Sequence, residues 1–560
     1  MVELRVLDGP NLYFTRPAIK VTLDVSPWLK LPQSRVERLT RRTAFTPSAS
    51  GGQPGSDQRR RYLARFAVHL TRALADATRT DLAVRGRPGP SPEQIVVAYP
   101  WRRRGAAEAF ARELAPLVAV GLDGRRSMDR ALAAAAQRLD RVQPGAPPTT
   151  LSPTMPVIAV TGTNGKTTTV RLIAHLARAA GHTVAYTTTD GVYRDQELVE
   201  AGDYSGFSGA AMALAQPGID FAVLETARGG ILLRGIGTAH NDVAVVTNVT
   251  EDHLDQYGIR TIDQLAEVKA TITRITRPDG WDVLNADDPR VLAMRRQATG
   301  RPWLFSLDAD HPAIRTTLAE GGRAISILDR SLVVMSSGRH VHHLLPVEDI
   351  PVALAGISSP YLRNAMAAAA AALGAGIPEE AVAEGLRSFV LDLDSNPGRA
   401  NLFELDGRVV VIDYAHNEDG MRGLVEICQG LRPGAAHIFL AFGTAGDRTN
   451  AILHRLAYTA ARGVDRPAIA ELHRYLRGRD PKDLVERLQA GLLDGGKAAA
   501  PVFANEVDAL EWMLEESAPD EVVAITALAQ RPEIFQLLQA RGGVPVGPAR
   551  LRELVQRARR

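Results

Sequence analysis

Cysteine is almost absent from this sequence of 560 residues, which contains only Cys428. A lone cysteine excludes an internal disulfide and fits a reducing compartment. No apolar run approaches the roughly 20 residues that a membrane-spanning helix needs, and the first residues lack the basic-then-apolar pattern of a secretory signal. These absences predict a cytoplasmic protein that has no membrane partner.

An excess of charge of one sign is also missing. Lysine and arginine number 66 and aspartate and glutamate 63, so the formal net charge is only +3. This value is too small to predict a nucleic-acid partner, and we expect the arginine-rich stretches 59–61 and 102–104 to be solvated surface. The length is too great for a single hydrophobic core and favours three or four domains.

The order of strand-like and helix-like patterns predicts an α/β fold in three parts. Residues 1–142 mix alternating and helical periodicities, which indicates a small α+β domain, and the Pro/Thr/Ser-rich run 143–154 reads as a linker. Over 155–394, β-branched runs alternate with helix-like segments, as in a parallel sheet covered by helices. A second such series predicts a Rossmann-like C-terminal domain over 398–560.

A phosphate-binding turn opens the central domain with "VTGTNGKTTTVRLI" at 160–173. Its small residues join a strand to a helix, where backbone N–H groups and the helix dipole can surround a phosphate. Lys166 can reach the outer phosphates, and the Thr167 hydroxyl can bind Mg²⁺. The turn is shorter than in the common P-loop, whose first glycine would stand at Val160. The residues expected at the phosphates are Gly162, Thr163, Asn164, Gly165, Lys166, Thr167 and Thr168.

Local signals predict several further elements. A strand is expected over 242–249, and Gly181 should stop the helix that begins at Lys166. Another helix is expected over 261–275, where Thr261 and Gln264 have the spacing of a capping box. The polar stretch 48–58 reads as a flexible loop.

The short turn with Asn164 resembles that of the Mur ligase superfamily, whose members form amide bonds by activating a carboxylate with ATP. Three later segments also resemble this family: "FAVLETARGGIL" (221–232), "VVTNVTEDHLDQYG" (245–258) and "TIDQLAEVKATITRI" (261–275). Glu225 ends a strand beside the P-loop strand, where a carboxylate can meet Mg²⁺. The resemblance implies that His253 helps to bind a metal and that Lys269 is carbamylated and becomes a further Mg²⁺ ligand. A solvent-facing Lys269 is the alternative.

Further segments carry the resemblance toward the C-terminus, among them "SSPYLRNAMAAAAAA" (358–372), "NPGRANLFE" (396–404) and "VVVIDYAHN" (409–417). They imply that Asn364 faces the adenine and that Arg399 lies near the γ-phosphate. Asp413 would accept hydrogen bonds from the ribose, and His416 would lie beside the phosphates. Pro397-Gly398 is the candidate hinge between the two large domains.

Within the superfamily, "FGTAGDRT" (442–449) and "LRGRDPKDL" (476–484) resemble the ligase half of the cyanophycin synthetases. Those enzymes carry an additional ATP-grasp ligase domain, for which the short stretch between residues 125 and 155 leaves no room. We therefore expect one ATP site and one type of ligation. Asp447 is a candidate partner for a cationic amine substrate, or it forms a plain salt bridge with Arg448.

The sequence thus predicts an ATP- and Mg²⁺-dependent ligase that forms an acyl phosphate and transfers the acyl group to the amine of an amino acid or peptide. The carboxylate and the amine stay open, with a cyanophycin-like aspartyl or arginyl substrate as one option. A P-loop ATPase with another output and a non-catalytic nucleotide-binding module are the alternatives. The expected partners are small-molecule or peptide substrates, and a homo-oligomer is compatible with the sequence.

Overall fold

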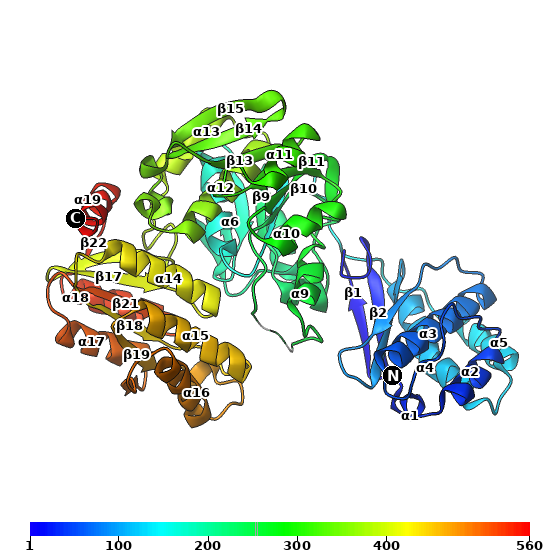
Figure 1. Cartoon of the computed structure of the whole chain (residues 1–560). Helices are drawn as coiled ribbons and strands as arrows, with labels where there is room; N and C mark the ends of the chain where they lie inside the picture. The colour runs from blue at the N-terminus through cyan, green and yellow to red at the C-terminus, as the bar shows by residue number, and fades with distance from the viewer. Residues whose placement is uncertain (253, 255) are drawn as a thin grey trace.

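The computed structural model describes residues 1–252, 254 and 256–560. Three sheets follow one another along the chain, and each carries its own helices, with the N-terminal unit at one end of the molecule and the C-terminal unit at the other (Figure 1). The expected α/β fold class is confirmed. Each sheet lies inside one of the segments 1–142, 155–394 and 398–560, whose boundaries stay a prediction.

The N-terminal unit is a four-stranded antiparallel sheet with the order β1-β2-β4-β3. Alternate residues of β2, Ile19, Val21 and Leu23, are buried with helices α3 and α4 in one apolar cluster. This alternation is the pattern that predicts a strand with one face on a core. The elements are β1 (Glu3–Leu7), β2 (Ala18–Asp24), α1 (Ser26–Leu29), α2 (Gln33–Arg41), α3 (Asp57–Ala77), β3 (Arg85–Pro88), β4 (Gln94–Pro100), α4 (Arg104–Asp123) and α5 (Met128–Leu139).

The expectation that residues 59–61 form a solvated surface is wrong for Arg59, which is fully buried. Its guanidinium donates hydrogen bonds to the carbonyls of Trp28, Leu31, Gly51 and Gly52 at 2.6–2.9 Å. A buried cation is tolerated when its donors are satisfied. Arg59 therefore fixes the loop before α3, which composition alone marked as flexible.

The central sheet has eleven strands in the order β15-β14-β13-β12-β11-β10-β5-β9-β6-β7-β8. The seven strands from β13 to β6 are parallel, and an antiparallel hairpin extends the sheet at each edge. The strands are β5 (Val157–Thr161), β6 (Val184–Thr187), β7 (Gly191–Arg194), β8 (Glu197–Ala201), β9 (Phe221–Glu225), β10 (Asn241–Val246), β11 (Thr276–Asn285), β12 (Arg301–Phe305), β13 (Arg323–Leu328), β14 (Ser331–Ser336) and β15 (His340–Pro346).

Helices cover both faces of the central sheet (Figure 1). The face with Ile158 and Val160 is buried against α6, α12 and α13. Gly181, which the sequence predicted as the stop of α6, follows its C-cap with a φ of +89°. The helices are α6 (Lys166–Ala179), α7 (Phe207–Leu214), α8 (Arg228–Leu233), α9 (Ile262–Lys269), α10 (Pro289–Ala293), α11 (Pro312–Ala319), α12 (Ser359–Gly374) and α13 (Glu379–Ser388).

The C-terminal sheet has the order β20-β19-β18-β21-β17-β16-β22, and its strands from β20 to β17 are parallel, as in a Rossmann-like domain. Its elements are β16 (Asn401–Leu405), β17 (Arg408–Asp413), α14 (Glu418–Leu431), β18 (Ile438–Phe442), α15 (Asn450–Gly463), β19 (Arg466–Ala470), α16 (Pro481–Asp494), β20 (Val502–Phe503), α17 (Glu506–Glu516), β21 (Val522–Thr526), α18 (Arg531–Ala540), β22 (Val544–Pro545) and α19 (Pro548–Ala558).

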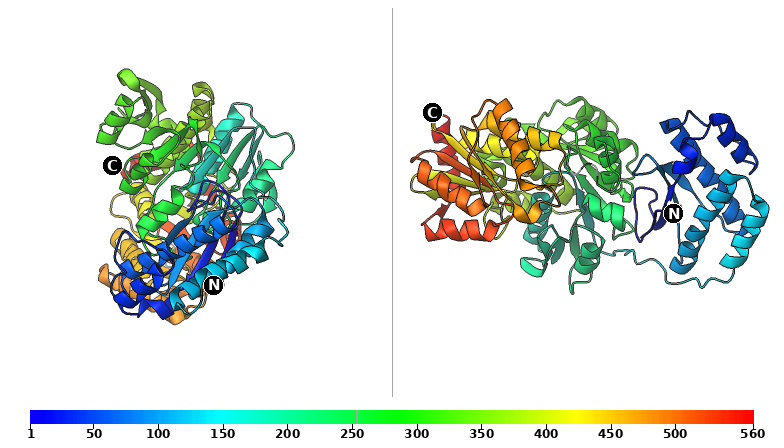
Figure 2. Two further views of the ribbon diagram at one scale, coloured as in Figure 1. Left: turned by 90° about the vertical axis from the view of Figure 1, so that its right-hand side faces the viewer. Right: turned by 90° about the horizontal axis from the view of Figure 1, so that it is seen from below.

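The loop between β1 and β2 joins the N-terminal unit to the central one. Leu12, Tyr13 and Phe14 lie in the same buried cluster as central residues such as Ala244 and Leu284. The linker after α5 returns along the outside (Figure 2). Within the described part of the chain, no helix combines the length and the apolar character that a bilayer crossing requires.

Candidate functional site

The phosphate-binding turn lies between β5 and α6, at the sheet edge where β9 and β10 also end. Two of its glycines are required by close contacts. A Cβ on Gly162 would lie 1.8 Å from the Thr247 hydroxyl, and a Cβ on Gly165, whose φ is +84°, would lie 2.2 Å from the Asn364 Oδ1. Only glycine fits at these two positions, because Thr247 and Asn364 pack directly against the turn.

The residues after β10 shape the turn from one side. The strand expected over 242–249 ends earlier, at Val246, because the next residues turn toward the P-loop. The Thr163 N–H donates to the Asn248 carbonyl at 2.9 Å, and the Thr247 hydroxyl donates to the Asn164 carbonyl at 2.6 Å. These bonds fix the backbone of the turn.

Ionisable side chains gather at the mouth of the turn. The Lys166 ammonium donates to the Thr163 carbonyl at 3.0 Å, and the Thr167 hydroxyl donates to Glu225 Oε2 at 2.9 Å. Lys269 ends α9 and donates to the Gly162 carbonyl at 2.5 Å. Its side chain is buried, so the solvent-facing alternative for Lys269 is wrong.

Burial perturbs the pKa values of Glu225 and Lys269. It raises the pKa of Glu225, against the opposing effect of Lys166. It also holds the pKa of Lys269 well below its usual range, and the positive charge of Lys166 adds to that effect. Perturbed ionisable groups that converge in a cleft are typical of functional sites.

The donors at Glu225 fit a hard divalent cation. Glu225 Oε1 is buried and lacks a hydrogen-bond partner among the described residues, while Oε2 faces the Thr167 hydroxyl. Carboxylate and hydroxyl oxygens are the ligands that Mg²⁺ prefers. Within residues 1–252, 254 and 256–560, no three His, Cys, Asp or Glu side chains form a metal cluster by themselves. The predicted metal ligand His253 lies outside the described residues.

The C-terminal unit contributes the opposite wall. Asp413 ends β17, and its Oδ2 accepts hydrogen bonds from the Tyr361 hydroxyl at 3.0 Å and the Ala400 N–H at 2.9 Å. Burial raises the pKa of Asp413, although Arg399 opposes this effect. The Arg399 guanidinium lies over the Tyr414 ring, 4.0 Å from its centroid.

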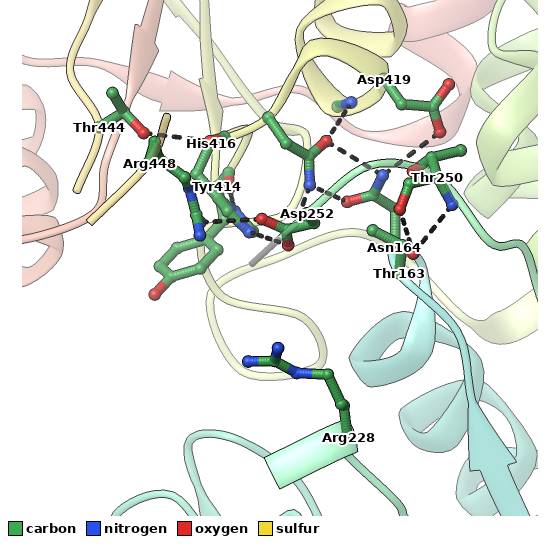
Figure 3. A network of polar contacts seen from close by, with 12 residues as sticks. Thr163, Asn164, Arg228, Thr250, Asp252, Tyr414, His416, Asp419, Thr444 and Arg448 are labelled. Atoms are coloured by element: carbon green, nitrogen blue, oxygen red, sulfur yellow. Dashed lines mark hydrogen bonds and ion pairs between the residues drawn. The ribbon is translucent and has the colours of Figure 1, made fainter. Parts of the chain in front are cut away.

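A polar network connects the two walls directly (Figure 3). Asn164 and Asn417 exchange hydrogen bonds through their amides at 3.1 and 2.9 Å, and Asn164 also donates to Asp419 at 3.3 Å. Asn417 is the N-cap of α14, where its Oδ1 accepts from the Gly420 N–H at 2.9 Å. One side chain therefore caps a helix of the C-terminal unit and contacts the P-loop.

Asp252 is a second junction in this network. It pairs with Arg448 at 3.0 Å and lies 3.5 Å from His416 Nε2, whose Nδ1 is 2.9 Å from the Tyr414 carbonyl. The Arg228 side chain extends from α8 toward the cluster around Asp252 (Figure 3). Sequence reasoning assigned no role to Asn417 or Asp252, although both lie inside segments that it quoted, next to the histidines that it chose.

A single cleft of about 1520 Å³ contains nearly all the predicted site residues. Those that line it are Gly162, Thr163, Asn164, Gly165, Lys166, Thr167, Thr168, Glu225, Lys269, Asn364, Arg399, Asp413 and His416. Asp447 instead accepts hydrogen bonds from Gln256 and Arg477. Asp447 forms an ion pair with Arg477, and Arg448, the partner that the sequence suggested, pairs with Asp252.

A parallel sheet with a phosphate-binding turn, faced across a cleft by a second α/β unit, defines a multidomain P-loop nucleotide-binding protein. Residues 160–372 match the Mur ligase middle domain, and residues 398–527 match the Mur ligase glutamate ligase domain. Through these two domains the chain belongs to the Mur ligase family, as the motifs predicted.

Curated relatives agree with this assignment. The chain is 37% identical over 383 residues to a cyanophycin synthetase of Synechocystis sp., which covers 68% of this chain and 43% of that protein. It is 29% identical to a UDP-N-acetylmuramoyl-L-alanyl-D-glutamate–2,6-diaminopimelate ligase of Gloeobacter violaceus, over 65% of this chain and 70% of that protein. The chain therefore spans less than half the length of the synthetase.

Among solved structures, E. coli FolC in complex with DHPP and ADP has a similar fold. The TM-score is 0.52 at 19% identity, and the match covers 70% of this chain and 90% of FolC. At this level of identity, the likeness extends to the fold and not to the substrate.

Proposed function

We propose that this chain is an ATP-dependent ligase that forms an amide bond between a substrate carboxylate and the amine of an amino acid or peptide. One observation carries the proposal: the P-loop and the Asp413–Asn417 loop of a second domain face each other across one cleft. The names of the relatives, cyanophycin synthetase and diaminopimelate ligase, support it.

ATP would supply the phosphoryl group that converts the substrate carboxylate into an acyl phosphate, from which the amine displaces phosphate. In this proposal Lys166, the amides of the turn and Arg399 bind the phosphates and stabilise the charge that develops during transfer. Thr167, Glu225 and a carbamylated Lys269, together with His253, would hold Mg²⁺. Asn364 and Asp413 would orient the adenine and the ribose, and His416 would lie at the phosphates.

The second domain has a clear task in this scheme. An acyl phosphate is lost if water reaches it, so the cleft must close over the reacting groups. The contacts of Asn417 and Asp419 with Asn164 hold the walls together at the phosphate-binding turn. We propose Pro397-Gly398 as the hinge; Gly398 has a φ of +73°, and the Pro397 carbonyl accepts from Arg531 at 3.1 Å.

The substrate class is less defined than the reaction. The synthetase relatives suggest an aspartyl or arginyl peptide, but this chain covers less than half of those enzymes. A short helix and an extended linker occupy the segment between α4 and β5. The proposal is therefore one type of ligation at one ATP site, in the cytoplasm, where ATP is available.

The test is a phosphate-release assay with ATP, Mg²⁺ and paired amino acids and short aspartyl peptides. A ligase needs both a carboxylate and an amine, so each omission should reduce release to background. Lys166→Ala should lose more than about tenfold of the rate, because it removes the main side-chain cation of the turn. Release that needs neither substrate would support an ATPase instead. Nucleotide binding without release for any pair would support a non-catalytic module.

A further inference from the structure

A second cavity, of about 370 Å³, lies where the β1–β2 loop and β3 meet the segment that follows α9. Three of its six lining residues are arginines, and they come from three different parts of the chain. The lining residues are Phe14, Thr15, Arg16, Ala83, Arg85 and Arg274. This cavity shares no lining residue with the large cleft.

The cavity wall is held in place by a buried asparagine. Asn11 Oδ1 accepts from the backbone N–H groups of Tyr13 and Phe14 at 3.0 and 3.1 Å, and its Nδ2 donates to the carbonyls of Gly9 and Arg16 at 2.9 and 3.1 Å. The side chain of Asn11 is 1% exposed. The loop that carries Phe14 and Arg16 is thus ordered by four hydrogen bonds from one side chain.

Arg85 and Arg274 are held at this wall by a ring, by backbone carbonyls and by a hydroxyl, and not by an ion pair with a carboxylate of the described residues. The Arg85 guanidinium lies 4.8 Å from the centroid of the Phe14 ring and donates to the Tyr13 carbonyl. Arg274 donates to the Thr271 hydroxyl at 2.9 Å and to the Leu12 carbonyl at 3.5 Å. Its Nε is buried and has no hydrogen-bond partner among the described residues.

The positive charge of the cavity is offset only in part, by the Glu267 carboxylate near Arg274. Over the described ranges, no carboxylate lies within ion-pair distance of Arg16, Arg85 or Arg274. The nearby Glu267 is engaged by Arg87, at 3.2 and 3.0 Å through both of its oxygens. Arg274 is half-buried and its Nε is unpartnered among the described residues, so a ligand that supplied negative charge would stabilise it. The exposed Arg16 and Arg85 beside it would add to the attraction for an anion.

We infer that this cavity binds an oxyanion, a carboxylate or phosphate group, between the guanidinium groups of Arg16, Arg85 and Arg274. Guanidinium forks match both groups in charge and geometry. The volume suits a small multivalent anion or the end of a larger acidic molecule. The inference does not depend on the proposed ligase activity, because none of the three arginines lines the catalytic cleft.

The test is calorimetric titration of the full chain with two probes, inorganic phosphate and tri-aspartate, while the non-hydrolysable analogue AMPPNP saturates the P-loop. We expect one probe to bind with a Kd of about 1 mM or lower and to weaken with added salt. The probe with the higher affinity identifies the anion as phosphate or carboxylate.

Variants locate the binding. Arg85→Ala and Arg16→Ala should each weaken it at least about fivefold, because each removes one guanidinium from the anion. Arg61→Ala removes the same charge from an exposed site on α3, outside the cavity, and should bind like the wild type. Arg85 and Arg16 are partly or fully exposed, so both variants should fold and keep the basal rate of phosphate release.

Two outcomes would overturn the inference. One is the absence of binding by either probe to the wild-type chain. The other is equal binding by the Arg85, Arg16 and Arg61 variants, which would place the anion elsewhere.

Discussion

At the residue scale, Lys269 and Glu225 are buried groups of opposite charge type beside one turn, and burial disfavours the ionised form of both. Burial holds the pKa of Lys269 well below its usual range, which favours the neutral amine over the ammonium. A neutral amine is the form that adds to carbon dioxide and releases a proton to give a carbamate. The depressed pKa thus supports the proposed modification of Lys269.

We expect Lys269→Ala to lose most of the phosphate-release activity, because it removes a proposed ligand from the Mg²⁺ site. Added acetate should restore part of the activity by supplying the missing carboxylate. The control is Lys482→Ala, at an exposed position on α16, which acetate should not affect. Full activity of Lys269→Ala without acetate would contradict the assignment.

Asp282 is a buried carboxyl group on β11 that does not line the large cleft, and burial raises its pKa to about 7 from 3.8. The folded chain thus binds more protons than the unfolded chain between these values, so stability falls as the pH rises through this window. Asp282 accepts from Thr276 at 2.7 Å and from the Gly300 N–H at 2.9 Å.

The Tm of the wild type should fall as the pH rises from about 4 to about 8. We expect this fall to be smaller in Asp282→Asn, because asparagine cannot ionise. The shift in the pKa of Asp282 corresponds to a loss of about 4 kcal/mol in the free energy of unfolding of the wild type. Thermal unfolding at several pH values measures this loss. Asp310→Asn, at an exposed position, should follow the wild-type pH profile. Parallel profiles for the wild type and Asp282→Asn would show that the carboxyl group is ionised throughout.

At the element scale, α9 presents Lys269 to the turn, although it has only eight residues. Its start is fixed by the capping box that the sequence predicted. The Thr261 hydroxyl accepts from the Gln264 N–H at 3.2 Å, and Gln264 Oε1 accepts from the Thr261 N–H at 3.2 Å. The helix expected over 261–275 ends at Lys269 itself, so the lysine stands at its C-terminal end.

Removal of this cap should destabilise the short helix. We expect Thr261→Ala to lower the free energy of unfolding by about 1 kcal/mol and to reduce activity, because α9 positions Lys269. Thr261→Ser keeps the hydroxyl and should retain both properties. Urea unfolding and phosphate release measure them, and equal stability of the alanine and serine variants would exclude a role for the cap.

Local patterns account for the elements that the sequence predicted well. The β5–α6 turn, the Thr261 cap and the Gly181 stop each depend on residues only a few positions apart, and the structure confirms them. The burial of Arg59 was not predictable, because its acceptors lie up to 31 residues away along the chain. The contact of Asn164 with Asn417 spans 253 residues and depends on how two domains meet.

At the scale of the whole molecule, Asn417 lets us separate helix capping from domain contact. Aspartate in its place keeps the oxygen that caps α14 but loses the amide that donates to Asn164 Oδ1 and lies near Asp252. It also adds a negative charge beside Asp252 and Asp419. The helix should therefore persist while the two walls of the cleft separate more readily.

We expect Asn417→Asp to lower the rate of phosphate release by about tenfold and to increase the radius of gyration measured by small-angle scattering. The matched control is Asn505→Asp, which changes the N-cap of α17 away from the cleft and should alter neither value. Unchanged rate and dimensions in Asn417→Asp would mean that other contacts hold the domains together.

The β1–β2 loop has one more consequence for the integrity of the chain. The N-terminal unit is attached twice: through the extended linker, and through backbone hydrogen bonds from Asp8 N–H to the Arg234 carbonyl at 2.8 Å and from Ile236 N–H to the Pro10 carbonyl at 2.7 Å. Only the first attachment is covalent, and the second includes the buried Leu12, Tyr13 and Phe14. A protease that nicks the exposed linker would thus leave two fragments that travel together as a non-covalent complex until a denaturant parts them.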